Sequence, residues 1–420
     1  MLIQFSTQNY MSIRERVDLS LEPTNDSAHP ESITEKGNQK ALNAALIYGA
    51  NASGKSNLFK AMTAAINYIR MSNSFQPGTR IPVVPFKLDE ESANSPTMFE
   101  FVFVADDGQK YIYGFSAFPD RVVEEYLYVY HTNRPTMIFD RKNVREYKFS
   151  RQHKAQLSPF TKMNTDNKLF LATATTWNAE STKPAFTWFQ SRIDTYSEEA
   201  LPNEHFALEA YRLDENKENQ KFTLELLKQS DINIISMDVK AKKIEKTAAT
   251  LGGINGIVVN GQIIIPNNQE QYEMKITTGH EVDGKRYMLS LDEESLGTKN
   301  LFFYGPMLKK TLDEGKVMFL DEIENSLHPA IVRYIVGMFG NPEINKNGAQ
   351  LISTTHETSL MNLKMLRKDQ YYFTEKDENT AVTRLYSLSD YSVRRKENIE
   401  KGYLLGRYGA VPLMGTAEVD

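Results

Sequence analysis

The sequence predicts an α/β protein that combines an antiparallel β lobe with a parallel-sheet lobe and carries an inserted helical and β region. Hydrophobic and polar residues alternate near the amino terminus and again between 98 and 130, which is typical of antiparallel strands. A short apolar segment at 44–48 leads through a glycine-bearing turn into helical spacing at 56–71. Later apolar segments, 317–320 and 350–354, alternate with helical patterns, as strands of a parallel sheet do.

The first predicted segment, 1–130, opens with a hairpin whose alternating strands lie at 2–5 and 17–21. The polar residues 22–40 contain two prolines and are predicted to form a loop. A second hairpin is expected around Asp107-Gly108, because an Asp-Gly pair tolerates the positive φ of a tight turn. The segment therefore adds antiparallel strands to the strand, glycine turn and helix named above.

The second predicted segment, 131–284, is the helical and β insertion. Residues 204–230 are rich in helix formers and are predicted to be helical, whereas the Gly/Asn-rich residues 240–270 are predicted to form loops and weak strands. The third segment, 285–420, is the predicted parallel-sheet lobe, with helices on either side of its strand at 317–320.

Composition restricts the chemistry. The chain has 420 residues, a formal net charge of −5 and no cysteine. Without thiols there is no disulfide framework, thiolate zinc site, iron–sulfur cluster or cysteine nucleophile, and a reducing compartment is compatible with the sequence. No run approaches the roughly 18 apolar residues that span a bilayer, and the amino terminus lacks the pattern of a secretory signal. We expect a cytoplasmic protein without a membrane partner.

The residues Gly49 to Ser56 match the pattern G-x-x-x-x-G-K-[ST] between a buried strand and the start of a helix. In this setting backbone N–H groups and the helix amino terminus can surround phosphate groups. Lys55 can reach the β and γ oxygens of a nucleotide, and Ser56 can ligate Mg²⁺. A chance glycine-rich turn is the alternative. The predicted nucleotide-binding residues are Gly49, Asn51, Ala52, Ser53, Gly54, Lys55, Ser56 and Asn57.

Two carboxylates, Asp321 and Glu322, follow the apolar strand at 317–320. Because side chains alternate along a strand, Asp321 can face a metal ion while Glu322 faces the γ-phosphate and polarises a water. His356 follows the next predicted strand and is expected beside the γ-phosphate, with a structural histidine as the alternative. The predicted catalytic residues are Glu322, His356 and Lys55, and the predicted Mg²⁺ ligands are Ser56 and Asp321.

With these motifs in this order, the chain resembles the ABC/SMC-type P-loop ATPases, with Walker A at Gly49–Ser56 and Walker B at Val317–Glu322. Their signature loop corresponds to Glu294–Lys299, and their D-loop to Asn325–Pro329, where His328 replaces the usual aspartate. The resemblance implies an ABC/SMC-like nucleotide-binding domain and a switch role for His356. It also implies a composite ATP site in a homo-oligomer of at least two copies, in which Ser295 and Gly297 of one copy face the ATP of another.

Three runs extend the resemblance to AAA-family ATPases of the Rlo/AbiL type, which are related to the ATPase part of OLD-type proteins. These runs are DEIENSLHP, STTHETSLMN and GYLLGRYGAVP. The resemblance implies an ATP-binding and hydrolysing regulator of a bacterial antiphage system of the abortive-infection type. OLD-type enzymes carry a Toprim nuclease, but the roughly 64 residues after His356 contain no glutamate followed by a D-x-D pair. A separate effector, a Toprim or Rlo-type nuclease, is therefore the expected partner.

Two other functions fit the same motifs. One is a RecF-like DNA-maintenance ATPase that clamps DNA, and the other is an assembly platform that ATP holds closed. In the carboxyl-terminal segment, basic residues at 394–396 and Arg407 occur beside Tyr391, Tyr403 and Tyr408. Such a group can hold phosphates or stack bases, or it can be a solvated charged face above buried tyrosines.

Overall fold

The computed structural model describes residues 1–197, 202–229, 233–243, 257–259, 262–264, 272–325, 327–394 and 396–411. They form two compact units. The first unit comprises residues 1–195, 314–323 and 336–420, and the second comprises 196–313 and 324–335. Residues 131–195, which the sequence places in the insertion, thus lie in the first unit.

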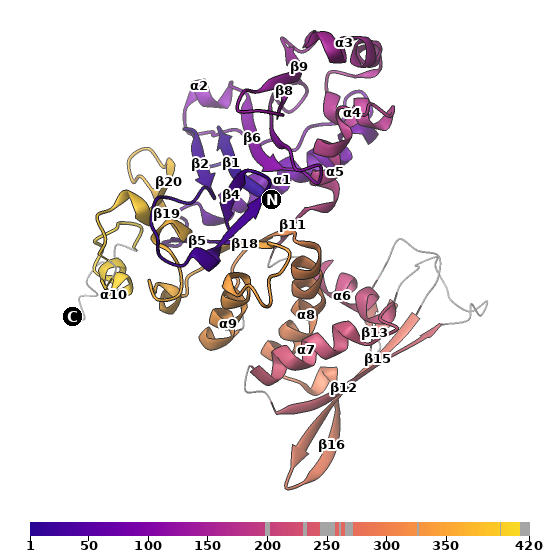
Figure 1. Ribbon diagram of the computed structural model, residues 1–420, viewed down its shortest axis with the longest axis vertical. Coiled ribbons are helices and arrows are strands. Elements are labelled where there is room, and N and C mark those ends of the chain that lie inside the picture. The colour runs from indigo at the N-terminus through magenta and orange to yellow at the C-terminus, as the bar shows by residue number, and fades with distance from the viewer. Residues whose placement is uncertain are drawn as a thin grey trace. The chain divides into compact units, whose positions relative to one another are not determined.

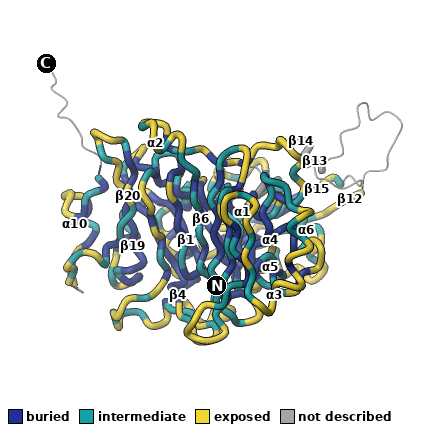
Figure 2. Tube along the Cα trace, turned by 90° about the horizontal axis from the view of Figure 1, so that it is seen from above, coloured by how far each residue is buried: buried dark blue, intermediate teal, exposed yellow. Residues whose placement is uncertain are grey.

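The antiparallel sheet of the first unit has the strand order β10-β9-β8-β7-β6-β1-β2. Its register confirms both predicted hairpins, because Phe5 of β1 pairs with Leu19 of β2, and Val104 of β6 pairs with Lys110 of β7. Figure 2 shows β1 and β6 among the buried parts of the chain. The strands are β1 (Leu2–Gln8), β2 (Val17–Ser20), β6 (Thr97–Val104), β7 (Lys110–Ala117), β8 (Val122–Tyr130), β9 (Thr136–Lys142) and β10 (Glu146–Phe149).

The second sheet of the first unit has the order β11-β17-β18-β5-β19-β20. Figure 1 labels five of its strands, namely β11, β18, β5, β19 and β20. Strands β17, β18, β5 and β19 run parallel, and β20 runs antiparallel to β19. The strands are β5 (Ala44–Gly49), β11 (Ile193–Tyr196), β17 (Val317–Leu320), β18 (Gln350–Thr354), β19 (Tyr371–Lys376) and β20 (Thr383–Ser387). The fold therefore contains the antiparallel and the parallel sheet that the sequence predicts.

Strand β5 lies inside the parallel sheet, although it belongs to the segment predicted as the antiparallel lobe. Each of its six residues is buried, and β18 and β19 pair with it along its two edges. A continuous apolar run is the pattern of such a central parallel strand. The amino-terminal segment thus contributes strands to both sheets.

Helix α1 (Lys55–Met71) contacts both sheets of the first unit. Its Phe59 ring lies 5.0 Å from Phe319 of β17, and its Tyr68 ring lies 5.6 Å from Phe115 of β7. Helices α4 (Phe170–Thr176) and α5 (Lys183–Ser191) pack against α1. The buried aromatic core therefore fixes the helix that follows the glycine turn.

A short hairpin replaces the end of the loop predicted at 22–40, whereas residues 22–29 form no helix or strand. Strands β3 (Ile33–Lys36) and β4 (Gln39–Leu42) pair antiparallel around Gly37, whose φ is 61°. Glycine adopts this conformation without steric cost, so a two-residue turn closes the hairpin. The loop prediction is wrong for this hairpin. Each strand has only four residues and includes polar ones, so no alternation of apolar and polar residues could be recognised.

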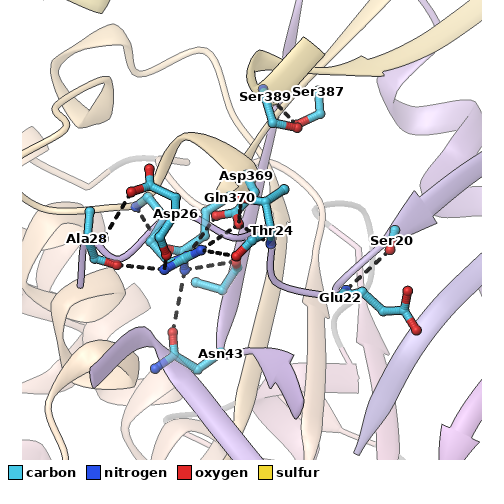
Figure 3. A network of polar contacts seen from close by, with 12 residues as sticks. Ser20, Glu22, Thr24, Asp26, Ala28, Asn43, Asp369, Gln370, Ser387 and Ser389 are labelled. Atoms are coloured by element: carbon cyan, nitrogen blue, oxygen red, sulfur yellow. Dashed lines mark hydrogen bonds and ion pairs between the residues drawn. The ribbon is translucent and has the colours of Figure 1, made fainter. Parts of the chain in front are cut away.

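Arg367 anchors the segment that precedes this hairpin. Arg367 is 1% exposed. Its guanidinium donates to both carboxylate oxygens of Asp369 at 2.9 and 2.8 Å and also to the carbonyls of Thr24, Asp26 and Ala28. Figure 3 shows four of these partners close together, namely Thr24, Asp26, Ala28 and Asp369. A cavity of about 950 Å³ opens beside it, lined by residues that include Thr24, Asp26 and Arg367.

The remaining helical segments of the first unit are short. They are η1 (Pro30–Ser32), η2 (Ser72–Ser74), α2 (Glu90–Ala93), α3 (Arg151–Leu157), η3 (Ser158–Met163), η5 (Thr358–Leu360), η6 (Lys368–Gln370), η7 (Leu388–Asp390) and α10 (Ile399–Leu404).

The second unit contains helices beside a sheet of order β12-β15-β13-β14, in which β16 also pairs with β15. Its buried core includes Ala207, Leu208, Met274, Ile276 and Phe302. The elements are α6 (Pro202–Arg212), α7 (Glu218–Gln229), β12 (Ile234–Lys243), β13 (Ile257–Val259), β14 (Gln262–Ile264), β15 (Tyr272–Val282), β16 (Lys285–Ser290), η4 (Leu291–Glu293) and α8 (Leu296–Glu314). Helix α9 (Pro329–Gly340) begins in this unit.

The helix predicted over 204–230 is two helices. Lys217 has a φ of 59°, and the Asp214 carboxylate accepts hydrogen bonds from the backbone N–H groups of Glu218 (2.8 Å) and Gln220 (3.1 Å). An acidic side chain that caps a new helix amino terminus explains the break. Of the predicted loops and weak strands at 240–270, residues 257–259 and 262–264 form the short strands β13 and β14, whereas 244–256, 260–261 and 265–270 lie outside the described residues.

Helix α8 contains Pro306, which has no N–H to donate to the carbonyl of Phe302. The hydroxyl of Tyr211 donates to that carbonyl at 2.7 Å and also contacts Thr223 Oγ1 at 2.7 Å. Burial raises the pKa of Tyr211, so this hydroxyl stays protonated and able to donate. Helix α6 thus satisfies the carbonyl that Pro306 leaves without a helical partner. In the described part of the chain no helix is long and apolar enough to span a membrane.

Candidate nucleotide-binding site

The Walker A loop connects the end of β5 to the start of α1. Neighbouring side chains leave no room for a Cβ at two glycines of the loop. A Cβ at Gly49 would lie 2.4 Å from Ser53 Oγ, and one at Gly54 would lie 2.3 Å from Thr383 Oγ1. Gly54 also has a φ of 109°, and Ala52 has a φ of 63°. Asn51 and Ala52 are exposed, whereas Ser53 is buried. The loop is therefore tightly wound and presents its middle to solvent.

Hydroxyl groups from outside the motif hold this loop. Ser53 Oγ contacts Thr374 Oγ1 of β19 at 2.7 Å, and Thr383 Oγ1 of β20 donates to the carbonyl of Ser53 at 2.9 Å. Asn57 Nδ2 donates to Ser12 Oγ at 2.6 Å, and Ser12 Oγ contacts Thr383 Oγ1 at 2.7 Å. Sequence reasoning missed Ser12, Thr374 and Thr383, because isolated hydroxyl residues have no diagnostic spacing.

The Lys55 ammonium lies inside the loop. Lys55 is 5% exposed, and its Nζ donates to the carbonyls of Gly49 at 2.8 Å and Ala50 at 3.2 Å. The half-buried Ser56 and Asn57 follow in the first turn of α1. A cation, the amino terminus of a helix and a glycine loop together attract phosphate groups.

The Walker B carboxylates are positioned by Thr354 at the end of β18. Thr354 Oγ1 donates to Asp321 Oδ1 at 2.6 Å and accepts from the backbone N–H of Glu322 at 2.7 Å. Glu322 has a φ of 55°, so the chain turns sharply after β17. Sequence reasoning also missed Thr354, although it stands two residues before the predicted His356.

The parallel register brings these groups to one edge of the sheet. Leu320 of β17 pairs with Ser353 of β18, and Thr354 of β18 pairs with Ile47 of β5. The carboxyl ends of the three strands therefore lie together, which is where open α/β sheets bind ligands. The Walker A loop, Asp321 with Glu322, and the exposed His356 all leave the sheet at this edge.

Mg²⁺ commonly binds through one or two carboxylates together with substrate phosphates. Ser56 and Asp321 offer hydroxyl and carboxylate oxygens of that kind, and Asp321 uses Oδ1 for Thr354. Its Oδ2 accepts no hydrogen bond within the described part of the chain. Among the described residues, no group of three or more His, Cys, Asp and Glu side chains could hold a metal by itself. The residues present fit a metal ion that phosphate groups help to hold.

The predicted signature residues belong to the second unit, whereas the Walker motifs belong to the first. Ser295 is exposed and precedes α8, where its Oγ accepts from the backbone N–H of Thr298 at 3.2 Å and contacts Thr298 Oγ1 at 2.8 Å. Ser295 thus caps α8, and Gly297 lies in the first turn of the helix.

The predicted D-loop follows Walker B along the chain. Asn300 of α8 donates to the carbonyl of Asn325 at 3.2 Å, and His328 Nδ1 accepts from the N–H of Ala330 at 3.2 Å. His328 therefore caps α9 in the place of the usual aspartate. Ser326 of this loop lies outside the described residues.

The carboxyl-terminal tyrosines are engaged with the protein itself. The hydroxyl of Tyr403 donates to the carbonyl of Ala410 at 3.0 Å, and that of Tyr408 donates to Glu397 at 3.0 Å. Arg407 also pairs with Glu397. These contacts favour the solvated charged face over a base-stacking surface. Arg395 of the basic group lies outside the described residues.

Solved structures similar to the chain include SMC head domains and the recombination mediator RecF. The SMC head domain from Thermotoga maritima has a TM-score of 0.39 at 11% identity and covers 92% of this chain and 98% of its own. The Pyrococcus furiosus Smc head with an extended coiled coil, bound to the C-terminal domain of ScpA, has a TM-score of 0.41 at 13% identity and covers 97% and 98%. RecF with ATP has a TM-score of 0.35 at 13% identity and covers 92% and 97%.

Among curated proteins, none matches the chain. One family profile matches residues 44–362, a range that contains both Walker motifs, the signature loop and His356. The matched range is more than half of the 420 residues. The chain therefore belongs to the P-loop family described as "AAA domain, putative AbiEii toxin, Type IV TA system".

Proposed function

We propose that this protein binds ATP with Mg²⁺ and hydrolyses it at sites shared between copies of the chain. The observation that carries the proposal is the parallel register, which gathers the Walker A loop, Asp321 with Glu322, and His356 at one edge of one sheet. A phosphate-binding loop beside two carboxylates is the arrangement that phosphoryl transfer to water needs.

Each side chain has a separate task in this reaction. Lys55 binds the β and γ phosphate oxygens after leaving the carbonyls of Gly49 and Ala50. Glu322 accepts the proton of the attacking water, whose oxygen bonds to the γ-phosphorus as the bond to the ADP oxygen breaks. His356 contacts the γ-phosphate. Mg²⁺, held by Ser56 and Asp321, offsets negative charge on the phosphates when it is bound.

The signature loop completes the site from a second copy. The exposed Ser295 and the first turn of α8 offer a hydroxyl and a helix amino terminus, both of which suit the γ-phosphate. In this arrangement each ATP lies between the Walker motifs of one copy and Ser295 with Gly297 of the other. The proposed oligomer is therefore at least a dimer.

For the cell, we propose a regulator of an antiphage system of the abortive-infection type, close to the Rlo/AbiL group. The proposal is supported by the family description, which names a toxin of a toxin–antitoxin system. ATP turnover would control a separate effector, a Toprim or Rlo-type nuclease. In the described ranges, no cluster of metal-binding side chains provides a nuclease centre of its own.

Mixed oligomers test the shared site. Lys55→Ala removes the phosphate cation, and Ser295→Arg obstructs the signature loop, so each variant alone is expected to lose nearly all ATPase activity. A mixture of the two has one composite site without either change, and part of the rate should return as the subunits exchange. Lys60→Ala, an exposed lysine on the same helix, is the matched control and should keep the wild-type rate. No recovery despite demonstrated exchange would contradict the shared site.

A further inference from the structure

A buried carboxylate joins the signature loop to the sheet of the second unit. Glu294 directly precedes Ser295, and its side chain is 7% exposed. Its Oε1 accepts hydrogen bonds from His280 Nε2 at 2.7 Å and from Thr278 Oγ1. Thr278 and His280 are two residues apart on β15, so both point to the same face of the sheet.

The strand that Glu294 contacts, β15, has paired neighbours on both of its edges. Strand β15 pairs with β12 along one edge and with β16 along the other, and Thr278 pairs with Leu289 of β16. Strand β16 then continues into η4, where Ser290 and Glu293 form a reciprocal capping box. The chain therefore runs from β15 through β16 and η4 to Glu294, whose side chain bonds back to β15.

Further along α8, Phe302 packs in the core that contains Met274 and Ile276 of β15. Among the described residues, Ser295 Oγ contacts Thr298 of its own helix, and Lys299 Nζ donates to the carbonyl of Asp292 at 2.9 Å. Ser295 and Leu296 are exposed. The buried Glu294 is thus the residue next to the exposed Ser295 that ties the start of α8 to β15 through hydrogen bonds.

We propose that Glu294 is a positioning residue for ATP hydrolysis, which holds Ser295 and Gly297 at the place where they meet the ATP of a second copy. The inference rests on the proposed composite site and names the contact that fixes its signature half. Through Thr278 and His280, the same contact couples the β12-β15-β16 sheet to that half of the site.

In this role, Glu294 affects the rate of ATP hydrolysis but not the affinity of a subunit for ATP. Glu294 belongs to the second unit, whereas the Walker A loop and the Walker B carboxylates belong to the first, so we expect ATP binding by a single subunit not to depend on it. Misplacement of a reacting group by about 1 Å can cost about 10²-fold in rate. Glu294→Ala should therefore lower kcat by about 10²-fold and leave ATP affinity, measured by calorimetry, unchanged.

Mixed oligomers assign Glu294 to one half of the site. Mixed with Lys55→Ala, the Glu294→Ala subunit keeps an intact Walker half and receives an intact signature half, so activity should rise above the sum of the two variants. Mixed with Ser295→Arg, both signature halves carry a change, and activity should stay at that sum. A purely structural role would give the same result with both partners, which would overturn the proposal, as would an unchanged kcat for Glu294→Ala.

Further variants keep the test decisive. If Glu294→Ala fails to fold, Glu294→Gln and the donor-side variants Thr278→Val and His280→Gln are assayed in its place and should show the same pattern with the two partners. Glu281→Gln changes the exposed neighbour on β15 and should keep the wild-type rate. The mixture of Lys55→Ala with Ser295→Arg separates the two claims. If this mixture regains no ATPase activity, the composite site is rejected. If it regains activity but the mixture of Lys55→Ala with Glu294→Ala does not, only the role of Glu294 is rejected.

Discussion

At the scale of single residues, the ATP site is held by hydroxyl groups that no motif contains. Thr354 contacts both Walker B residues through one oxygen, and Thr374 and Thr383 hold Ser53 of the Walker A loop. The motif residues themselves could be predicted, because their chemistry requires fixed residue types at fixed spacing. Their supports could not, because a hydroxyl at a strand end is common and its partner lies far away in the sequence.

Thr354→Val tests this support. Valine has the same shape and suits a buried strand, but it cannot donate to Asp321 or accept from the N–H of Glu322. The turnover rate should fall while ATP affinity changes little, and the unfolding free energy should drop by about 1–3 kcal/mol for the polar groups left unpaired. Thr354→Ser keeps the hydroxyl and should behave like the wild type. Equal turnover in Thr354→Val and Thr354→Ser would show that the contact does not position Walker B.

At the scale of elements, the strands and helices that carry the motifs could be predicted from periodicity, whereas those between 131 and 196 could not. The pairs β1–β2 and β6–β7 and the helix α1 follow clear patterns, and the structure confirms them. The position of β5 in the chain did not predict that it belongs to the parallel sheet. Its continuous apolar run, buried on both faces, is the feature that could have predicted it. The break between α6 and α7 depends on one capping residue, Asp214, within a stretch of good helix formers.

The contact between α6 and α8 gives a prediction about stability. Tyr211→Phe leaves the carbonyl of Phe302 without a donor, because Pro306 cannot replace it, and also removes the contact with Thr223. The unfolding free energy should fall by about 1–3 kcal/mol. Tyr287→Phe removes a hydroxyl from a half-exposed tyrosine of β16 and should change stability by less than about 0.5 kcal/mol. Denaturant unfolding of the full chain measures both, and equal values for the two variants would contradict the role of Tyr211.

At the scale of the whole molecule, the two halves of the predicted ATP site lie in different compact units. The Walker motifs and His356 belong to the first unit, and Ser295 with Gly297 belongs to the second. The sequence predicts both sets of residues, but the pairing of copies across ATP rests on the resemblance and remains a proposal. The division into segments 1–130, 131–284 and 285–420 likewise remains a prediction.

The proposed division of labour with an effector gives a prediction for the intact protein. The purified chain should hydrolyse ATP but cleave neither DNA nor RNA, and its expression without the proposed effector should be harmless to the cell. Gel assays on plasmid, linear DNA and RNA, with and without ATP, measure cleavage directly. Nucleolytic cleavage that is lost on mutation of residues outside the ATP site would contradict the assignment of a separate effector.

The most direct measurement of the central claim is ATP turnover by Glu322→Gln together with its ATP affinity. The amide cannot accept the proton of the attacking water, while Asp321 and the Walker A loop remain, so ATP should bind normally and turnover should fall by about 10²–10⁴-fold. The variant should also accumulate the closed oligomer with ATP bound. Glu378→Gln, an exposed glutamate between β19 and β20, is the matched control and should keep the wild-type rate. Wild-type turnover by Glu322→Gln would contradict catalysis at this edge of the sheet.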